Sequence, residues 1–373
     1  MVTIREAKKR SDVVRFMKYP LTLYKGDTRY VPDVLSSQVD DIDPKKNPAF
    51  AYCETKCFLA ERDGEIVGRV QGILNNRANE KFGKKYLNFT NLDFIDDDEV
   101  VDALFAALEG YARSLSCEAV HGPLGFSDMD REGLLVEGFE HRSLFYTFYN
   151  RPYYIEQLTR KGYVKQVDWL EYRINVPTEK DEKLHKLSEY VKKKLRMRSV
   201  SLGDIPTKRL MRDVFALWND TYRVLFGVVA MSDAQMEKYT SEFLPMVTKQ
   251  TTSFVYNDKD ELVAFAITCP SIDSAMQSCG GKLTPFGWIP MLRALHGHTD
   301  TLDFLLIAVR PDLQGAGINA ILLDDLQDKI VGTGYRYAET GPMLEMNHRV
   351  LSIWKHFDAT QHKRRRCFVK ELR

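Results

Sequence analysis

Residues 310–326, RPDLQGAGINAILLDDL, combine two glycines with the start of a helical pattern. The apolar run at 304–309 before them is typical of a strand. A helix N-terminus has unpaired N–H groups and a partial positive charge, and glycine lets a backbone approach an anion closely. The turn could therefore bind a phosphate or pyrophosphate. A second interpretation stays open, because Gly315 and Gly317 could simply form a tight turn between a strand and a helix.

An earlier copy of the same layout offers a comparison. The segment AVHGPL at 119–124 matches AETGPM at 338–343, and the same shift aligns LDFIDDDEVV at 92–101 with the glycine turn. The positions of residues 315–318 are then taken by Asp96, Asp97, Asp98 and Glu99. These acids would repel a pyrophosphate but suit the positive end of a helix. We predict that the first copy is structural at this point and that its acids cap the helix.

The turn and its context resemble the GNAT superfamily of acyl-CoA N-acyltransferases. The signature of that family, Q/R-x-x-G-x-G/A between a strand and a helix, is similar to Gln314-Gly-Ala-Gly317-Ile-Asn319, with Asn319 in place of the last Gly or Ala. The resemblance implies an α/β (α+β) fold of two tandem GNAT-like domains, each a mixed central sheet flanked by helices, with a degenerate first copy. It also implies acetyl-CoA or another acyl-CoA as co-substrate and no metal.

The resemblance further implies a set of coenzyme-binding residues. In such folds the strand before the turn splays from its neighbour, and pantetheine bonds to its backbone. A later helix often starts near an asparagine, here Asn347, and carries a tyrosine seven residues on, where this chain has Trp354. Tryptophan cannot protonate a departing thiolate, so Cys367, Tyr335 or a water would do so, or the thiolate would leave without help. The implied set is Ile307, Val309, Gln314, Gly315, Ala316, Gly317, Ile318, Asn319 and Asn347.

Carboxylates near the strand gap are candidates for a catalytic base. An amine acceptor must lose a proton, and a carboxylate or a water that it orients could take it. The candidates are Glu345, Glu339 and Asp303, each of which could equally be a surface carboxylate. We predict transfer of an acyl group, in the first instance acetyl, to an amine by direct attack in a ternary complex. The alternatives are a non-catalytic acyl-CoA-binding or scaffold protein and transfer of a longer acyl chain.

Each copy is expected to read strand, helices, hairpin, strand, helix, strand. Hairpin patterns start at residues 57 and 253, and one-faced helical patterns follow at 101–112 and 318–330. A further helix is predicted at about 182–196, after Pro177. The predicted domains are 1–176 for the degenerate copy and 200–373 for the copy with the acyl-CoA site, joined by a linker helix within 177–199.

Two further segments have open interpretations. The second copy carries extra residues between 271 and 299 that include Phe286, Trp288, Ile289, Met291 and Leu292. They could form a lid or wall for an apolar acyl chain or acceptor, or pack the two copies together, which we prefer. The basic C-terminal run HKRRRCFVKELR is interpreted as a solvated edge strand, with a contact to the coenzyme 3′-phosphate or to an acidic acceptor as the alternative.

Length and composition limit the number of domains and the classes of partner. A chain of 373 residues with 44% hydrophobic residues suits about two globular domains. The net charge of +1 gives no reason to expect a nucleic acid or an anionic membrane as partner, and no apolar run approaches the ~20 residues of a membrane span. The six cysteines form no Cys-x-x-Cys pair and are expected to be free thiols in a cytoplasmic protein. The predicted partner is a small-molecule amine or another acceptor, and the sequence carries no signal for an oligomeric state.

Overall fold

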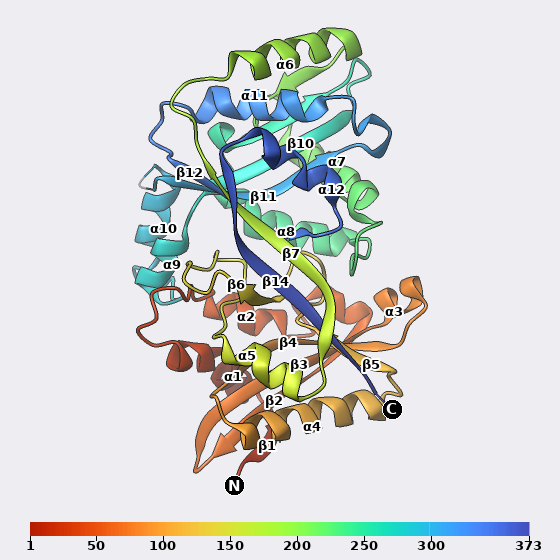
Figure 1. Ribbon diagram of the computed structural model, residues 1–373, viewed down its shortest axis with the longest axis vertical. Coiled ribbons are helices and arrows are strands. Elements are labelled where there is room, and N and C mark those ends of the chain that lie inside the picture. Colours follow the sequence, from red (N-terminus) through yellow and green to blue (C-terminus); the bar gives the residue numbers. More distant parts are fainter. Residues whose placement is uncertain (298, 373) are drawn as a thin grey trace. The chain divides into compact units, whose positions relative to one another are not determined.

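The computed structural model describes residues 1–297 and 299–372 (Figure 1). The chain forms two compact units, one of residues 1–170, 273–290 and 362–373, and one of residues 171–272 and 291–361. Each unit contains a mostly antiparallel sheet with helices packed on it, which confirms the predicted fold class. In the described part of the chain, no helix has both the length and the apolar character needed to cross a bilayer. All six cysteines are free thiols.

The first unit orders its sheet β1-β2-β3-β4-β5-β14. Its elements are β1 (Thr3–Glu6), α1 (Arg10–Leu23), α2 (Leu35–Asp41), η1 (Pro48–Ala51), β2 (Cys53–Arg62), β3 (Glu65–Asn75), α3 (Asn76–Phe82), β4 (Tyr86–Phe94), α4 (Asp98–Ser114), β5 (Ala119–Gly122), β6 (Leu134–Glu137), α5 (Tyr153–Arg160), the first part of β7 (Val164–Asn175), α9 (Asp273–Cys279) and most of β14 (Ala359–Glu371). Asp63 and Gly64 join β2 to β3 with φ of 53° and 86°, as a two-residue hairpin turn requires.

The second unit orders its sheet β7-β12-β11-β10-β9-β8. Its elements are the last part of β7, α6 (Glu182–Leu195), β8 (Arg198–Val200), α7 (Thr207–Tyr222), α8 (Asp233–Phe243), η2 (Leu244–Met246), η3 (Lys249–Thr251), β9 (Thr252–Tyr256), β10 (Leu262–Pro270), β11 (Thr301–Val309), η4 (Pro311–Leu313), α11 (Ile318–Ile330), β12 (Tyr337–Thr340), β13 (Met343–Leu344), α12 (His348–Leu351) and η5 (Ile353–His356). The helix α10 (Trp288–Leu295) runs across the boundary at residue 290.

The predicted internal repeat is confirmed. The order β1-β2-β3-β4-β5 in the first unit corresponds to β8-β9-β10-β11-β12 in the second, and the last pair in each series is parallel. The predicted hairpins are β2–β3 and β9–β10, and the predicted one-faced helices are α4 and α11. In α4 the side chains of Val101, Leu104, Phe105 and Leu108 are fully buried, because the 3.6-residue helical period turns all of them toward the sheet.

The predicted linker helix is α6, which lies beside α11 in the second unit (Figure 1). Val191 of α6 packs into one apolar cluster with Ile318, Ile321 and Leu322 of α11 and with Val255 of β9. Its burial fixes α6 next to the start of α11, where the glycine turn lies.

Strand β11 extends beyond its parallel neighbour. Pairing between β11 and β12 runs from Thr301 opposite Tyr337 to Phe304 opposite Thr340, where β12 ends. Residues 305–309 therefore continue without β12 beside them, while residues 306–309 still pair with β10 on the other side. This is the open strand edge that the family resemblance implied.

The two units do not coincide with the predicted ranges 1–176 and 200–373. Residues 173–175 of β7 pair with β12 of the second unit, and residues 368–371 of β14 pair with β5 of the first. The predicted ranges followed the sequence repeat, which shows only where similar segments recur. The compact units instead depend on strand pairing between segments that are distant in sequence.

The interpretation of the C-terminal run as a solvated edge strand is wrong. Strand β14 lies between β5 and β7 in the sheet order. Lys363 and Arg365 are fully buried, and an Arg365 guanidinium nitrogen lies 2.9 Å from Thr147 Oγ1. On the other face Arg366 donates two hydrogen bonds, of 2.7 and 2.9 Å, to the buried carboxylate of Asp168. Buried cations need a paired carboxylate or other acceptors. Here Thr147 accepts from Arg365 and Asp168 accepts from Arg366.

Candidate active site

A cavity of about 800 Å³ opens in the second unit beside the N-terminal end of α11. It is lined by residues from α6, α7, β11, the glycine turn, α11 and the segment 347–357. Eight of the nine predicted coenzyme-binding residues line it: Ile307, Val309, Gln314, Gly315, Gly317, Ile318, Asn319 and Asn347. Ala316 does not line the cavity. The tertiary structure thus brings the turn, the open edge of β11 and Asn347 to one cavity.

The backbone of the turn requires both glycines. Gly315 and Gly317 have φ of 85° and 86°, a left-handed conformation that residues with a Cβ rarely adopt. A Cβ on Gly317 would also lie 3.1 Å from Val191 of α6, whereas a Cβ on Gly315 would meet nothing within 4 Å. Both glycines therefore form a tight turn, as one interpretation predicted. Whether the turn can also bind a phosphate depends on which of its backbone N–H groups lack a hydrogen-bond partner.

The turn leaves several backbone donors unpaired. Gly317 is the N-cap of α11 and offers no side chain to it. Within residues 1–297 and 299–372, no hydrogen bond uses the N–H groups of Gly315, Gly317, Ile318 or Asn319, all of which line the cavity. The N–H of Ala316, by contrast, bonds to the carbonyl oxygen of Leu313 at 3.2 Å. Four free donors at the positive end of a helix dipole form a site that suits an anion.

Gln314 fixes the turn and does not serve as a free donor. Its side-chain nitrogen bonds to the Val309 carbonyl oxygen at 3.1 Å, and its side-chain oxygen accepts a 2.5 Å bond from Arg349. Arg349 is thereby held at the cavity wall as a cation. Arg310 instead bonds to Asp312 at 2.7 Å and to Glu261 at 3.2 Å, so it is occupied by carboxylates. The bond from Arg310 holds the pKa of Asp312 below its usual value.

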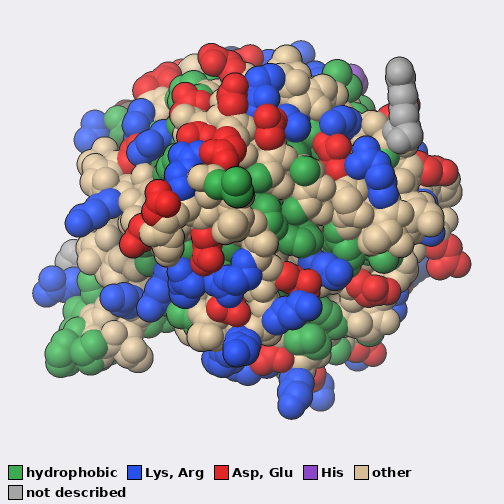
Figure 2. All heavy atoms as spheres, turned by 90° about the horizontal axis from the view of Figure 1, so that it is seen from below, with side chains coloured by type: hydrophobic (Ala, Val, Ile, Leu, Met, Phe, Trp, Pro, Cys, Tyr) green, Lys and Arg blue, Asp and Glu red, His purple; other side chains and the backbone are tan. Residues whose placement is uncertain are grey.

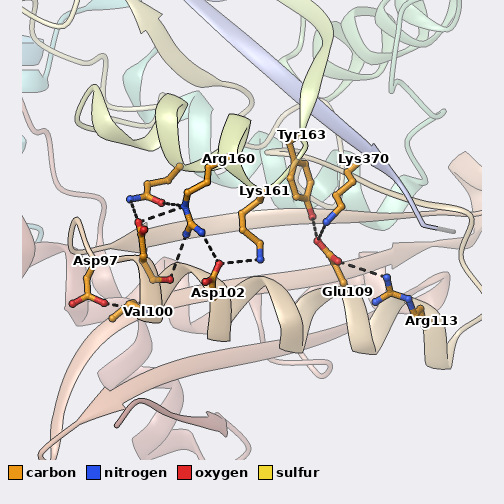
Figure 3. A network of polar contacts seen from close by, with 11 residues as sticks. Asp97, Val100, Asp102, Glu109, Arg113, Arg160, Lys161, Tyr163 and Lys370 are labelled. Atoms are coloured by element: carbon orange, nitrogen blue, oxygen red, sulfur yellow. Dashed lines mark hydrogen bonds and ion pairs between the residues drawn. The ribbon is translucent and has the colours of Figure 1, made fainter.

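The first unit has the opposite arrangement at the start of α4 (Figure 3). The Asp97 side chain accepts a 3.1 Å bond from the Val100 N–H, and it also receives two bonds from Arg62. The hydrogen bonds from Arg62, opposed by partial burial, lower the pKa of Asp97. Gln157 bonds to both Asp96 and Asp98. The prediction that these acids cap the helix is confirmed, and this helix end is already occupied by the protein itself.

Tyr222, which the sequence analysis did not single out, reaches the open strand edge. Its hydroxyl bonds to the Ile307 carbonyl oxygen at 3.0 Å, its ring stacks on Trp218, and it lines the cavity. The adjacent Thr221 also lines the cavity, and among the described residues its buried hydroxyl has no hydrogen-bond partner. The helical pattern of α7 showed which residues would be buried, but no local signal showed that its last turn faces β11.

Trp354 belongs to the core and not to the cavity. It is 3% exposed, its indole N–H points to the Met343 sulfur at 3.2 Å, and its ring packs edge-on against Phe304. The nearby side chain of Asn347 accepts a 3.4 Å bond from Val350 N–H and so caps α12. The position at which the resemblance implied a tyrosine is therefore occupied by a packing residue.

The three predicted carboxylates do not line the cavity. Asp303 and Glu339 are cross-strand neighbours in the parallel β11–β12 pair, and Asp303 is fully buried. Glu339 is half-buried with its carboxylate 4.0 Å from Arg173, and Glu345 is half-buried after β13. Their role as a base stays a prediction, and any of them would act on the cavity only through an intervening group.

The alternative proton donors are also away from the cavity. Cys367 lies in the first unit and is fully buried, and this burial raises the pKa of its thiol well above the usual value. Burial likewise raises the pKa of Tyr335, which does not line the cavity. Tyr222 is the one tyrosine among the described lining residues.

One group of potential metal ligands lies between α6 and α11. Ligand atoms of His185, Asp324 and Asp328 lie within 4.8 Å of one another. His185 Nδ1 is 3.2 Å from Asp324, and Lys180 Nζ is 2.6 Å from Asp328. Both carboxylates therefore already have an ion-pair or hydrogen-bond partner within the protein, and no metal was predicted from the sequence.

Comparison with known proteins extends over the whole chain. No protein-family model matches it. It is 25% identical to Protein YghO of Escherichia coli K12 over 99% of this chain and 95% of that one, and 23% identical to the bacterial ceramide synthase of Caulobacter vibrioides over 100% and 98%.

Solved structures that resemble it include GNAT proteins. A tandem GNAT protein from the clavulanic acid biosynthesis pathway superposes with a TM-score of 0.57 at 13% identity, covering 100% of this chain and 98% of that one. A GCN5-related N-acetyltransferase from Sphaerobacter thermophilus gives 0.52 at 12% identity, with 100% and 96% covered. The chain therefore has the tandem GNAT fold.

Proposed function

We propose that the chain is an acyl-CoA-dependent N-acyltransferase whose coenzyme lies in the cavity at the start of α11. The observation that carries the proposal is the set of four unpaired N–H groups, of Gly315, Gly317, Ile318 and Asn319, beside the open edge of β11. Each hydrogen bond to a charged group contributes about 1.5–3 kcal/mol. These donors, with Arg349 close by, suit a pyrophosphate, and the open strand edge suits the amides of pantetheine.

The acyl group and the acceptor are proposed to be long-chain. Apolar side chains dominate the rest of the lining, among them Leu184, Leu187, Leu313, Ile353 and Phe357. A fatty acyl chain would find more contact there than an acetyl group would. The similarity to a bacterial ceramide synthase points the same way, because a ceramide is an N-acylated long-chain amino alcohol. We therefore propose fatty acyl-CoA as donor and a long-chain amine as acceptor, with acetyl transfer as the alternative.

The reaction proposed is direct attack in a ternary complex. The neutral amine attacks the thioester carbonyl carbon, a C–N bond forms, the C–S bond breaks, and the sulfur leaves as a thiolate that takes up a proton. Tyr222 is our candidate for the donor of that proton, since its hydroxyl lies in the cavity against Ile307. The proton lost by the amine goes to a water or carboxylate, for which Glu345, Glu339 and Asp303 stay the candidates to test.

Calorimetric titration with coenzyme A, acetyl-CoA and palmitoyl-CoA tests the coenzyme site. The variant Gly315→Asp places a carboxylate at the turn, where no atom crowds a new Cβ. The control is Gly332→Asp, which has a similar φ of 81°, equally open surroundings and no place in the cavity. We expect binding to wild type and to the control and no measurable binding to Gly315→Asp. Equal binding by all three proteins would place the coenzyme elsewhere.

A turnover assay tests the reaction. Product formation from palmitoyl-CoA and a long-chain 2-amino alcohol, followed by mass spectrometry, is expected to exceed that from acetyl-CoA. A second candidate function, coenzyme binding without transfer, is favoured by the buried Trp354 at the family's tyrosine position. Binding without turnover on a panel of short and long amines would decide for that function.

A further inference from the structure

The segment 282–296 exposes four large apolar side chains. The exposed fractions are 69% for Phe286, 48% for Trp288, 37% for Ile289 and 45% for Leu292. In Figure 2, hydrophobic side chains gather at the left edge of the displayed face, the side on which Figure 1 draws α9 and α10. The preferred interpretation from sequence, that these residues pack the two copies together, stays a prediction.

Helix α10 presents to solvent the face that a helix usually buries. At 3.6 residues per turn, Trp288, Ile289 and Leu292 share one side with Arg293, and Ala294, on the opposite side, is the buried residue. A surface helix of a globular protein normally turns its apolar stripe inward and its charged residues outward. The exposed stripe lies on α10 and continues to Phe286 just before the helix.

The charges of the segment are of one sign. No aspartate or glutamate occurs between Asp273 and Asp300, whereas Lys282 and Arg293 are both exposed. Among the ion pairs of the described residues, none involves either cation. Aromatic and aliphatic side chains bordered by unpaired Lys and Arg are the composition of helices that lie in the interface of an anionic membrane.

We propose that segment 282–296 docks the protein on an anionic lipid surface. Phe286, Trp288, Ile289 and Leu292 would enter the boundary between headgroups and acyl chains, and Lys282 and Arg293 would meet the lipid phosphates. The net charge of +1 gave no reason to expect a membrane partner, but net charge does not describe a local surface. The inference does not depend on the proposed function, although long-chain substrates would be drawn from such a surface.

Intrinsic fluorescence gives a specific readout, because Trp288 is the exposed one of the four tryptophans. Trp169, Trp218 and Trp354 are 3%, 1% and 3% exposed. The full-length protein is mixed with vesicles of phosphatidylcholine alone or with phosphatidylglycerol. With the anionic vesicles we expect a blue shift of the emission, loss of acrylamide quenching, quenching by brominated lipid, and co-sedimentation with an affinity about tenfold or more above that for neutral vesicles.

Matched variants distinguish vesicle binding by this segment from nonspecific binding by exposed apolar residues elsewhere. Ile289→Asp with Leu292→Asp is expected to abolish co-sedimentation, and Lys282→Glu with Arg293→Glu is expected to remove the preference for anionic lipid. The control is Phe82→Asp with Val164→Asp, which changes apolar residues that are 40% and 61% exposed elsewhere and should bind vesicles like wild type. Coenzyme titration of all variants, without vesicles, checks their fold and keeps this test separate from that of the proposed function.

Three results would overturn the proposal. The first is equal fluorescence and no sedimentation with either kind of vesicle. The second is binding that survives in the Ile289→Asp, Leu292→Asp variant. The third is protection of Trp288 from acrylamide that rises with protein concentration in the absence of lipid, which would assign the stripe to a second copy of the chain.

Discussion

The hydroxyl of Tyr222, at the end of α7, donates a 3.0 Å hydrogen bond to the carbonyl oxygen of Ile307 on β11. Ile307 lies in the part of β11 that extends past the end of β12. A main-chain acceptor at the open strand edge is thus in contact with a phenol that also lines the cavity. Any ligand that bonds to this edge must lie next to, or displace, the Tyr222 hydroxyl.

The substitution Tyr222→Phe is expected to lower the rate of acyl transfer about 100-fold, the lower end of the effect of a general acid. Because the donors of the glycine turn are untouched, the affinity for coenzyme A should change by less than about threefold, roughly 0.6 kcal/mol. Steady-state kinetics and calorimetry measure the two quantities. Tyr190→Phe, at an exposed tyrosine of α6, is the control. An unchanged rate would remove Tyr222 from the mechanism.

His121 should make the stability of the protein fall in mild acid. Its ring nitrogens lie 2.7 Å from Asn88 Oδ1 and 3.0 Å from Gln166 Oε1, and burial lowers its pKa to about 4. An unfolded histidine has a pKa of about 6.5, so the unfolded state binds more protons between these values. Stability is therefore unaffected by this group above about pH 6.5 and falls by up to about 3 kcal/mol as the pH drops toward 4.

Denaturant unfolding at pH 7 and at pH 4.5 measures this effect for His121. Other groups titrate in the same range, so the comparison is with His121→Gln, which keeps hydrogen-bonding capacity without a titrating ring. The variant is expected to lose less stability than wild type between the two pH values. Identical losses would mean that the ring is protonated in the folded protein.

The cap of α4 should matter for stability and not for coenzyme binding. Asp97→Ala removes the acceptor for the Val100 N–H and the partner of Arg62, at an expected cost of about 1–2 kcal/mol. Asp97→Asn keeps a good cap and loses only the charge, so it should cost less. Thermal unfolding and coenzyme titration of both variants test this. An equal loss in the two variants would argue against the capping role.

Trp354 is expected to act through packing alone. Trp354→Ala should destabilise the second unit by about 3–5 kcal/mol, because it removes a buried aromatic side chain that contacts Phe304. Trp354→Tyr introduces the tyrosine that the resemblance implied but should not raise the transfer rate, since this side chain does not line the cavity. A gain of tenfold or more, about 1.4 kcal/mol in the activation barrier, would show that the residue reaches the reacting atoms.

The sequence by itself determined the elements and their repetition. The Asp63-Gly64 turn, the one-faced helices α4 and α11 and the glycine turn before α11 are all readable from nearby residues. They depend on backbone preferences and on apolar periodicity, which act over a few positions. The contrast between the acidic turn at 96–99 and the glycine turn at 315–318 was also visible in the sequence, because the repeat aligned them.

Only the tertiary structure decided which distant residues meet. It paired β7 with β12 and β14 with β5, buried Lys363 and Arg365, placed Tyr222 against Ile307, and put Trp354 in the core. It also left the apolar side chains Trp288, Ile289 and Leu292 of α10 in solvent. None of these outcomes follows from spacing along the chain, because each depends on contacts between segments far apart in sequence, which form only when the sheets assemble.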